Sequence, residues 1–341
     1  MKLKKKILSV IISTLLILSA FPFSLSASAA EVGYEDMFFT VDNSTYTAEL
    51  STYSGNGSEL VIPDTVYGYT VTSIAPRVFY ENKTLEEVYL PDTINSIGLY
   101  AFAFCEKLKS TTLGENVTFL ADNVFFGCPA LEQAVVNCNI ETLPTGTFEK
   151  CAALNSVTLS DSISALGNSS FMGCSSLEDL PTENIVSYGS NCFQGTNAAE
   201  VVIADGVTYL PWMCFAQCNN LTWVTIPESV SSINSTAFYQ ILDNIEIKCF
   251  CDSFAHSFAV ENTIDHMILD RQLGDVNFDG AVDVFDATEI QKYAAESTDF
   301  TPDQFELGDI NKDGYCDVID ALLVQKSVIG AYEMPQNIIR Y

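Results

Sequence analysis

Residues 85–108 read LEEVYLPDTINSIGLYAFAFCEKL, and residues 154–177, LNSVTLSDSISALGNSSFMGCSSL, repeat the same spacing of leucine, phenylalanine and cysteine. The pattern restarts every 21 to 23 residues, at Leu85, Leu108, Leu131, Leu154, Leu177, Ala198, Leu221 and Leu242. A unit of this length cannot bury its own apolar face, whereas stacked units share one continuous core. The repeat therefore predicts a solenoid.

Three apolar ladders run through the repeat. An apolar pair such as Val88 and Leu90 stands three and five residues after each start, and this alternation predicts a short strand with one buried face. A second ladder consists of Ile74, Ile97, Leu120, Leu143, Leu166, Leu210 and Ile233. The third consists of Phe79, Phe102, Phe125, Phe148, Phe171, Phe193, Phe215 and Phe238. Because burial of one phenylalanine contributes roughly 1.5–3 kcal/mol, we expect the phenylalanine ladder to dominate stability.

The two quoted units resemble the bacterial surface-antigen type of leucine-rich repeat, over roughly residues 58–250. The resemblance implies an α/β-type leucine-rich-repeat solenoid with short parallel strands and capped ends. One departure is Pro181, which falls inside a predicted strand and predicts a kink or bulge there.

Both ends of the solenoid carry patterns of a cap. FFTVDNSTYTAEL, residues 38–50, alternates about an Asp42-Asn43 turn and predicts an N-terminal capping hairpin within residues 31–57. DSFAHSFAVEN, residues 252–262, predicts a helix in a C-terminal cap of residues 251–270. On that helix Phe254, Ala255, Phe258 and Ala259 share one face.

Residues 1–30 indicate export. Four lysines, an apolar run from Ile7 to about Phe21 and small residues up to an Ala-x-Ala-like site predict a secretory signal peptide. A membrane anchor is the alternative, but polar and small residues follow the run and no second span appears. The exported chain would hold 11 basic and 44 acidic residues, a net charge near −33. Such a charge disfavours nucleic acid and anionic membrane surfaces and suits divalent cations.

Cysteine also follows the repeat, since Cys105, Cys128, Cys151 and Cys174 are each 23 residues apart. Three interpretations are open: buried small hydrophobic residues, disulfides between coils roughly 5 Å apart, or zinc ligands. Zinc is disfavoured because the Cys-x-x-Cys spacing is absent.

The repeat region lacks the pattern of an enzyme. The chain has two histidines, His256 and His266, both in the predicted C-terminal cap, and no His-Glu-x-x-His, Gly-x-Ser-x-Gly or phosphate-binding glycine loop. We assign no catalytic residue.

Strand residues between the buried pairs are expected to face outward and could bind a ligand, with Trp223 and Tyr89 as anchors. The alternative is that they are ordinary exposed sheet residues. The candidate ligand-binding residues are Glu87, Tyr89, Thr112, Thr158, Trp223 and Thr225.

A different repeat follows the solenoid: GDVNFDGAVDVFDATEIQKYA begins at Gly274, and GDINKDGYCDVIDALLVQKSV begins 34 residues later at Gly308. Each places oxygen donors at positions 1, 3, 5, 7, 9 and 12 of a loop, a spacing that wraps them around one calcium ion. Gly280 and Gly314 at position 6 permit the sharp turn. The candidate ligands are Asp275, Asn277, Asp279, the carbonyl of Ala281, Asp283 and Asp286 in loop one, and Asp309, Asn311, Asp313, the carbonyl of Tyr315, Asp317 and Asp320 in loop two.

The paired loops resemble a type I dockerin over residues 271–335, with helices expected at about 284–295 and 318–330, no helix entering loop one and a tail of residues 336–341. The resemblance implies a small all-α dockerin with two EF-hand-like calcium motifs. It also implies two bound calcium ions and a cohesin partner on a scaffold protein of a cellulosome. The residues implied in cohesin recognition are Val284, Phe285, Gln291 and Lys292 on the first helix and Val318, Ile319, Gln325 and Lys326 on the second.

Together these patterns predict a secreted, non-catalytic recognition protein. Its dockerin would attach it to a scaffold protein, and hence near the cell surface, in a machinery of polysaccharide catabolism. Its solenoid would bind a protein or glycan. Two alternatives remain open: a dockerin-borne enzyme acting on plant polysaccharide, and a surface adhesin or structural spacer.

Overall fold

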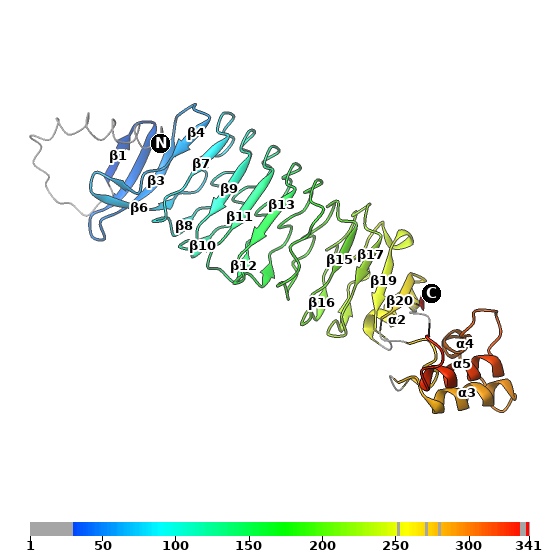
Figure 1. Ribbon diagram of the computed structural model, residues 1–341. Helices are drawn as coiled ribbons and strands as arrows, with labels where there is room; N and C mark the ends of the chain where they lie inside the picture. The colour runs from blue at the N-terminus through cyan, green and yellow to red at the C-terminus, as the bar shows by residue number, and fades with distance from the viewer. Residues whose placement is uncertain (1–29, 251–252, 270–271, 279–280, 335–338, 341) are drawn as a thin grey trace, which may run out of the picture.

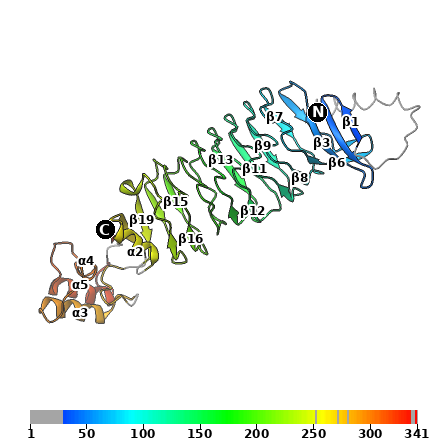
Figure 2. The same ribbon diagram turned by 180° about the vertical axis from the view of Figure 1, so that it is seen from behind.

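The computed structural model describes residues 30–250, 253–269, 272–278, 281–334 and 339–340, so the predicted signal peptide lies almost entirely outside the described residues. Stacked coils form an elongated solenoid, and a small group of helices follows at its C-terminal end (Figure 1). The view from behind shows the same stack of coils and the same terminal helices (Figure 2).

One side of the solenoid carries the first series of strands. These are the strands expected at the apolar pairs. Where neighbouring strands of this series pair, they pair in parallel, so that equivalent residues of successive coils face each other, as Ala134 faces Thr111 and Val157. The series comprises β7 (Glu87–Tyr89), β9 (Ser110–Leu113), β11 (Gln133–Val136), β13 (Ser156–Leu159), β15 (Glu200–Val202), β17 (Trp223–Thr225) and β19 (Glu246–Cys249).

A second series of two-residue strands contains the second apolar ladder. These strands also pair in parallel where they pair, for example Phe119 with Ser96 and Leu120 with Ile97. The series comprises β8 (Ser96–Ile97), β10 (Phe119–Leu120), β12 (Thr142–Leu143), β14 (Ala165–Leu166), β16 (Tyr209–Leu210) and β18 (Ser232–Ile233).

The first series is not one continuous sheet. β7 pairs with β4 (Glu59–Val61), β9, β11 and β13 form a second sheet, and β15, β17 and β19 belong to a third. The break between β13 and β15 falls in the coil of Pro181, which forms no strand on this side, so the expected kink or bulge is in fact the loss of a strand. Beside the breaks the inward residues Val88, Leu90, Val157 and Leu159 are only half-buried.

The phenylalanine ladder is the centre of the solenoid core. All eight of its side chains are buried. Consecutive ring centroids lie 4.8–5.8 Å apart, and the ring planes are tilted by at most 18°. Offset stacking of this kind adds to the stabilisation that burial provides.

The repeated cysteines lie beside this ladder as buried thiols. The Sγ atom of Cys128 donates a hydrogen bond to the carbonyl oxygen of Phe102 in the preceding coil at 3.1 Å, and Cys151 makes the same contact with Phe125. The ten cysteines within the described ranges are all buried, and Cys105, Cys128, Cys151 and Cys174 carry free thiols. Their thiols therefore fill space and satisfy backbone acceptors.

The N-terminal end is covered by antiparallel strands. β2 (Met37–Asp42) and β3 (Thr47–Tyr53) form the expected hairpin, β1 (Ala30–Tyr34) adds to its outer edge, and β3 pairs in parallel with β6 (Tyr69–Ile74). β5 (Thr65–Val66) pairs with β6 as well. Because alternate residues of β2 are buried, its inner face covers the first coil.

The C-terminal end is covered by α2 (Phe254–Glu261) and β20 (Asp265–Ile268), which follow a short 3-10 helix, η1 (Leu242–Asn244). Ala255, Phe258 and Ala259 are buried, but Phe254 is 42% exposed, so its predicted place on the buried face is wrong. Because an α-helix turns about 100° per residue, Phe254 lies at the edge of the face that Ala255, Phe258 and Ala259 share. β20 extends the third sheet and pairs on its far side with β21 (Ile339–Arg340).

The described residues of the last unit form the helices α3 (Val284–Ala294), α4 (Pro302–Gly308) and α5 (Val318–Val328). α3 and α5 pack against each other. The apolar residues that the two helices bury are Ala287 and Ile290 on α3 and Ala321 and Val324 on α5, and each helix also buries an aspartate in its first turn. Cys316, at position 8 of loop two, is buried in the same core.

Candidate functional site

Loop two, Asp309–Asp320, curls around the carboxylate at its first position. Asp309 Oδ1 accepts a hydrogen bond from the backbone N–H of Asp313 at 3.1 Å, and Oδ2 accepts one from Gly314 at 2.9 Å. Gly314 has φ +87°, in the left-handed region that glycine adopts at little cost. The predicted glycine turn is therefore present in this loop.

The carboxylate at position 12 ties each loop together. Asp320 is fully buried, and its oxygens accept hydrogen bonds from the backbone N–H groups of Ile310, Asn311 and Asp317 at 2.9–3.2 Å. Asp286 in loop one is equally buried and bonded to Val276, Asn277 and Asp283 at 2.9–3.1 Å. The two loops are thus built alike, 34 residues apart.

Burial makes these two carboxylates electrostatically costly. It raises the pKa of Asp286 and of Asp320, and the neighbouring charges of Asp275 and Asp309 raise them further, while the backbone donors act in the opposite direction. A divalent cation held by these carboxylates would stabilise their ionised form.

The donor set of loop two fits calcium by type and order. All six predicted positions supply oxygen, and the backbone turns at Gly314 as the loop pattern requires. In loop one, Asp279 and Gly280 lie outside the described residues. Across the described ranges no three Asp, Glu, His or Cys side chains gather closely enough to hold a metal ion.

Loop two has an entering helix that the sequence interpretation missed. α4 ends at Gly308, directly before Asp309, so loop two is flanked by a helix on each side. The signal was present in the sequence: Thr301 and Gln304 form a reciprocal capping box around Pro302 at the start of α4.

The predicted cohesin-binding residues lie on the outer surfaces of α3 and α5. Val284 and Phe285 are 52% and 67% exposed in the first turn of α3, and Val318 and Ile319 are 63% and 51% exposed in the first turn of α5. Further along, Gln291, Lys292, Gln325 and Lys326 are exposed as well. Each helix therefore presents an apolar pair followed by a polar pair to solvent.

The two helix faces differ in one respect. α5 exposes Leu322, and Ile329, the residue directly after α5, is exposed as well. The positions 34 residues earlier hold Thr288 and Ala295. The α5 face is therefore the more apolar of the two.

The candidate ligand-binding residues of the solenoid do not form one site. Glu87, Tyr89 and Thr112 lie on neighbouring strands β7 and β9 and line one cavity, and Thr158 is on β13. Trp223 and Thr225 are on β17, in the third sheet.

The ring of Trp223 is less accessible to a ligand than its outward strand position predicts. The Nζ atom of Lys248 lies 3.2 Å from the centroid of its ring, and Trp223 is half-buried. Lys248 thus occupies one face of the ring through a cation–π contact.

The two histidines lie together in the C-terminal cap. Their ring centroids are 5.3 Å apart, and the Nδ1 atom of the buried His266 lies 3.1 Å from the carbonyl oxygen of Ile264.

In the described residues, no helix combines the length and the apolar character needed to cross a membrane.

The stacked repeats and the paired loops define a class of protein, a repeat solenoid joined to a docking module. The family described as BspA type leucine rich repeat region matches this chain in six copies over residues 72–188 and 186–279, and the chain belongs to that family. The description dockerin type I domain matches residues 273–329. A type I dockerin implies a cohesin partner in an assembly of the cellulosome type, and both modules are typical of extracellular bacterial proteins.

Several solved structures are similar to this chain. A leucine-rich cell surface protein from Faecalibacterium prausnitzii is 22% identical, with 64% of this chain and 76% of that chain covered and a TM-score of 0.41. The leucine-rich repeat protein of T. pallidum is 22% identical over 60% and 86% of the two chains, with a TM-score of 0.37. One from Bacteroides ovatus is 21% identical over 64% and 70%, with a TM-score of 0.39. None of the curated proteins compared with this chain is detectably similar to it.

Proposed function

We propose that this protein is an exported, non-catalytic recognition protein whose dockerin, with one calcium ion in each loop, docks on a cohesin of a scaffold protein. The observation that carries the proposal is the matched construction of the two loops. In each loop, a buried aspartate at position 12 accepts three backbone hydrogen bonds. The two residues before that aspartate are an exposed apolar pair in the first turn of the helix that follows the loop.

Calcium acts in this proposal through the shape of the loops. The ion offsets the repulsion among the four aspartates of each loop, and its binding free energy becomes folding free energy. Since Asp286 and Asp320 are the third helical residues of α3 and α5, a loop that closes on its ion also fixes the first turn of its helix. The exposed pairs Val284–Phe285 and Val318–Ile319 are in those turns.

The near two-fold repetition offers a cohesin two faces. The first consists of Val284, Phe285, Gln291 and Lys292, and the second of Val318, Ile319, Gln325 and Lys326. A partner can then dock in two orientations, and the loss of one of two equal faces lowers affinity by only about a factor of two. Because the α5 face is more apolar, we expect the orientation that buries it to dominate.

The solenoid is the recognition domain in this proposal, and it binds a protein or a glycan on the outer face of its first strand series. Solenoids present such extended surfaces to ligands. The candidate contacts remain Glu87, Tyr89, Thr112, Thr158, Trp223 and Thr225, which the two sheet breaks divide into three groups: Glu87 with Tyr89, Thr112 with Thr158, and Trp223 with Thr225.

The experiment that tests the docking proposal is a titration of the full chain with a panel of type I cohesins in calcium, beside the same titration after chelation. Binding in calcium that is lost on chelation supports the proposal. Absence of binding to every cohesin, or binding that chelation leaves intact, contradicts it.

A further inference from the structure

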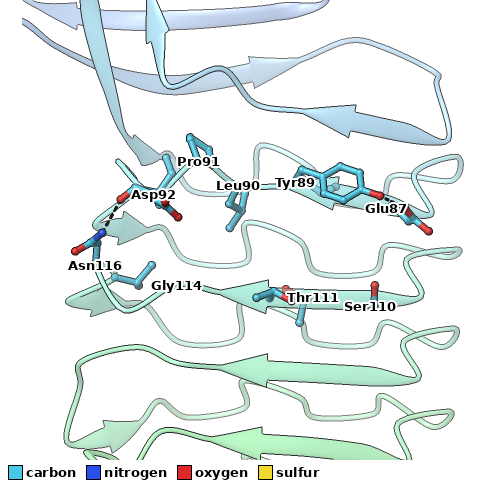
Figure 3. A pocket seen from close by; sticks show the side chains of 13 residues that line it. Glu87, Tyr89, Leu90, Pro91, Asp92, Ser110, Thr111, Gly114 and Asn116 are labelled. Carbon is cyan, nitrogen blue, oxygen red and sulfur yellow. Dashed lines mark hydrogen bonds between the residues drawn. The ribbon is translucent and has the colours of Figure 1, made fainter. Parts of the chain in front are cut away.

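A cavity of about 460 Å³ opens on the strand face of the solenoid between the coils that begin at Leu85 and Leu108 (Figure 3). It lies at the first sheet break, where β7 pairs only with β4 and β9 pairs only with β11. Ligand pockets are typically about 300–1,000 Å³, so this opening has the size of a small-molecule site.

Two residues of the coil that begins at Leu108 depart from the repeat beside the cavity. Thr111 is buried at an inward position where other coils place Val88, Ala134, Val157 and Val224, so a hydroxyl replaces a purely apolar side chain. Gly114 stands where the next coil has Asn137. A Cβ at Gly114 would meet no atom within 4 Å, and its φ is ordinary, so neither packing nor backbone geometry requires glycine there.

Polar groups lie at both ends of the cavity. At one end the hydroxyl of Tyr89 donates to a carboxylate oxygen of Glu87, which leaves the ring 48% exposed and fixes its position. At the other end Asn116 Nδ2 donates to the backbone oxygen of Asp92 at 3.0 Å. Figure 3 shows Leu90, Thr111 and Gly114 between these ends.

The charges of the lining select against anions. Glu87 and Asp92 are the charged residues that line the cavity, and no lysine, arginine or histidine of the described chain does so. Phosphate, sulfate and carboxylate ligands would therefore be repelled. The two carboxylates lie at opposite ends (Figure 3), so they do not converge on a single cationic group.

We propose that this cavity binds a neutral, hydroxyl-rich ring, the chemical class of a pyranose unit of a glycan. The aromatic face of Tyr89 and the half-buried side chain of Leu90 suit the C–H faces of such a ring. The hydrogen-bonding groups at the two ends suit its hydroxyls. The inference rests on the proposed recognition function of the solenoid and gives it a site and a ligand class.

The test is calorimetric titration of the full chain in calcium with cellotetraose, xylotetraose and mannotetraose as neutral probes. Oligogalacturonate serves as the anionic probe and chitosan tetraose as the cationic one. We expect at least one neutral probe to bind and the anionic probe not to bind. Binding should weaken at least tenfold in Tyr89→Ala, which removes the ring, and in Gly114→Asn, which fills the cavity with the residue of the next coil.

Matched controls lie outside the cavity. Phe119→Ala removes another exposed aromatic side chain, and Glu200→Gln removes a carboxylate at the strand position equivalent to Glu87. Both should bind within twofold of the unmodified protein. Thermal melting of every variant shows that the coils are intact, which is expected because Gly114 faces open space and Tyr89 is exposed.

Three results would overturn the inference. Failure of all neutral probes, or binding of a charged probe alone, rejects the ligand class. Neutral binding that survives Tyr89→Ala or Gly114→Asn rejects the cavity but leaves the recognition function standing. Calcium-dependent cohesin binding is measured on the same protein, and none of these three results affects it. Failure of the cavity proposal is therefore distinguishable from failure of the docking proposal.

Discussion

The Oδ1 atom of Asp320 accepts a hydrogen bond from the backbone N–H of Ile310, 2.9 Å away, and so joins the last position of loop two to its second position. Asp286 and Val276 repeat this relationship in loop one at 3.0 Å. The position-12 carboxylate therefore closes the loop through hydrogen bonds in addition to its proposed role as a calcium ligand.

Replacing that carboxylate should destabilise the dockerin even without calcium. In Asp320→Ala three backbone N–H groups lose their acceptor, and each buried donor left unsatisfied costs about 1–3 kcal/mol. We expect the dockerin transition in differential scanning calorimetry of the chelated full chain to fall or vanish. Asp299→Ala, at an exposed site, is the control and should change stability by less than about 0.5 kcal/mol. Equal melting of the two variants would show that the loop closure contributes nothing.

Chelation should act on the dockerin alone. An ion that binds only the folded state stabilises it by about 4.1 kcal/mol at a concentration 1,000 times its dissociation constant. Calorimetry of the full chain should therefore show one transition that moves down when calcium is removed and a solenoid transition that does not. If both transitions keep their temperatures after thorough chelation, the proposed calcium requirement is wrong.

The phenylalanine ladder should be the most sensitive part of the solenoid. The Phe148 ring lies 5.6 Å from the rings of both Phe125 and Phe171 and is fully buried, so Phe148→Ala should lower the free energy of unfolding by about 3–5 kcal/mol. Phe119→Ala removes the same side chain from a site that is 57% exposed and should cost less than about 0.5 kcal/mol. Urea denaturation followed by circular dichroism measures both. Similar costs for the two variants would refute the ladder as the core.

The buried thiols predict a loss of stability in alkali. Burial raises the pKa of Cys138 and of Cys316 to about 12. In the unfolded chain a thiol ionises near pH 8.5, so above that pH the unfolded state holds fewer protons than the folded state and the free energy of unfolding falls. The melting temperature should therefore decrease between about pH 9 and pH 12. Cys138→Ala should reduce that decrease, and an unchanged pH profile in this variant would contradict the assignment.

The two docking faces should be separable by mutation. Val284→Asp with Phe285→Asp removes the apolar pair of α3, and Val318→Asp with Ile319→Asp removes that of α5. We expect each double variant to keep cohesin binding, the second to lose more affinity because the α5 face is the more apolar, and the combined variant to lose binding altogether. If either double variant alone abolishes binding while calcium loading persists, the interface is one-sided.

Much of the fold follows directly from the sequence because stacked coils need like residues at like positions. Phe148 and its neighbours recur at one phase of the repeat, and the structure places them in one ladder. The hairpin about Asp42-Asn43 was likewise predictable, since alternating residues flank a turn.

Other features depend on geometry that residue type does not encode. Val88 and Leu90 form the apolar pair that is typical of the repeat, yet β7 and β9 do not pair, and the cavity that results could not be predicted. Pro181 indicated a local irregularity, but in a shortened coil it removes the strand entirely. Phe254 lies only at the edge of the buried face of α2 and is exposed.

The central claim is that calcium-loaded loops make this protein a cohesin ligand, and one titration tests it most directly. The full chain and its Asp286→Ala, Asp320→Ala double variant are titrated with a cohesin that the unmodified chain binds in calcium. The account predicts that chelation and the double variant each abolish binding, and that restored calcium rescues the unmodified chain but not the variant. Undiminished binding by the chelated chain or by the variant would contradict it.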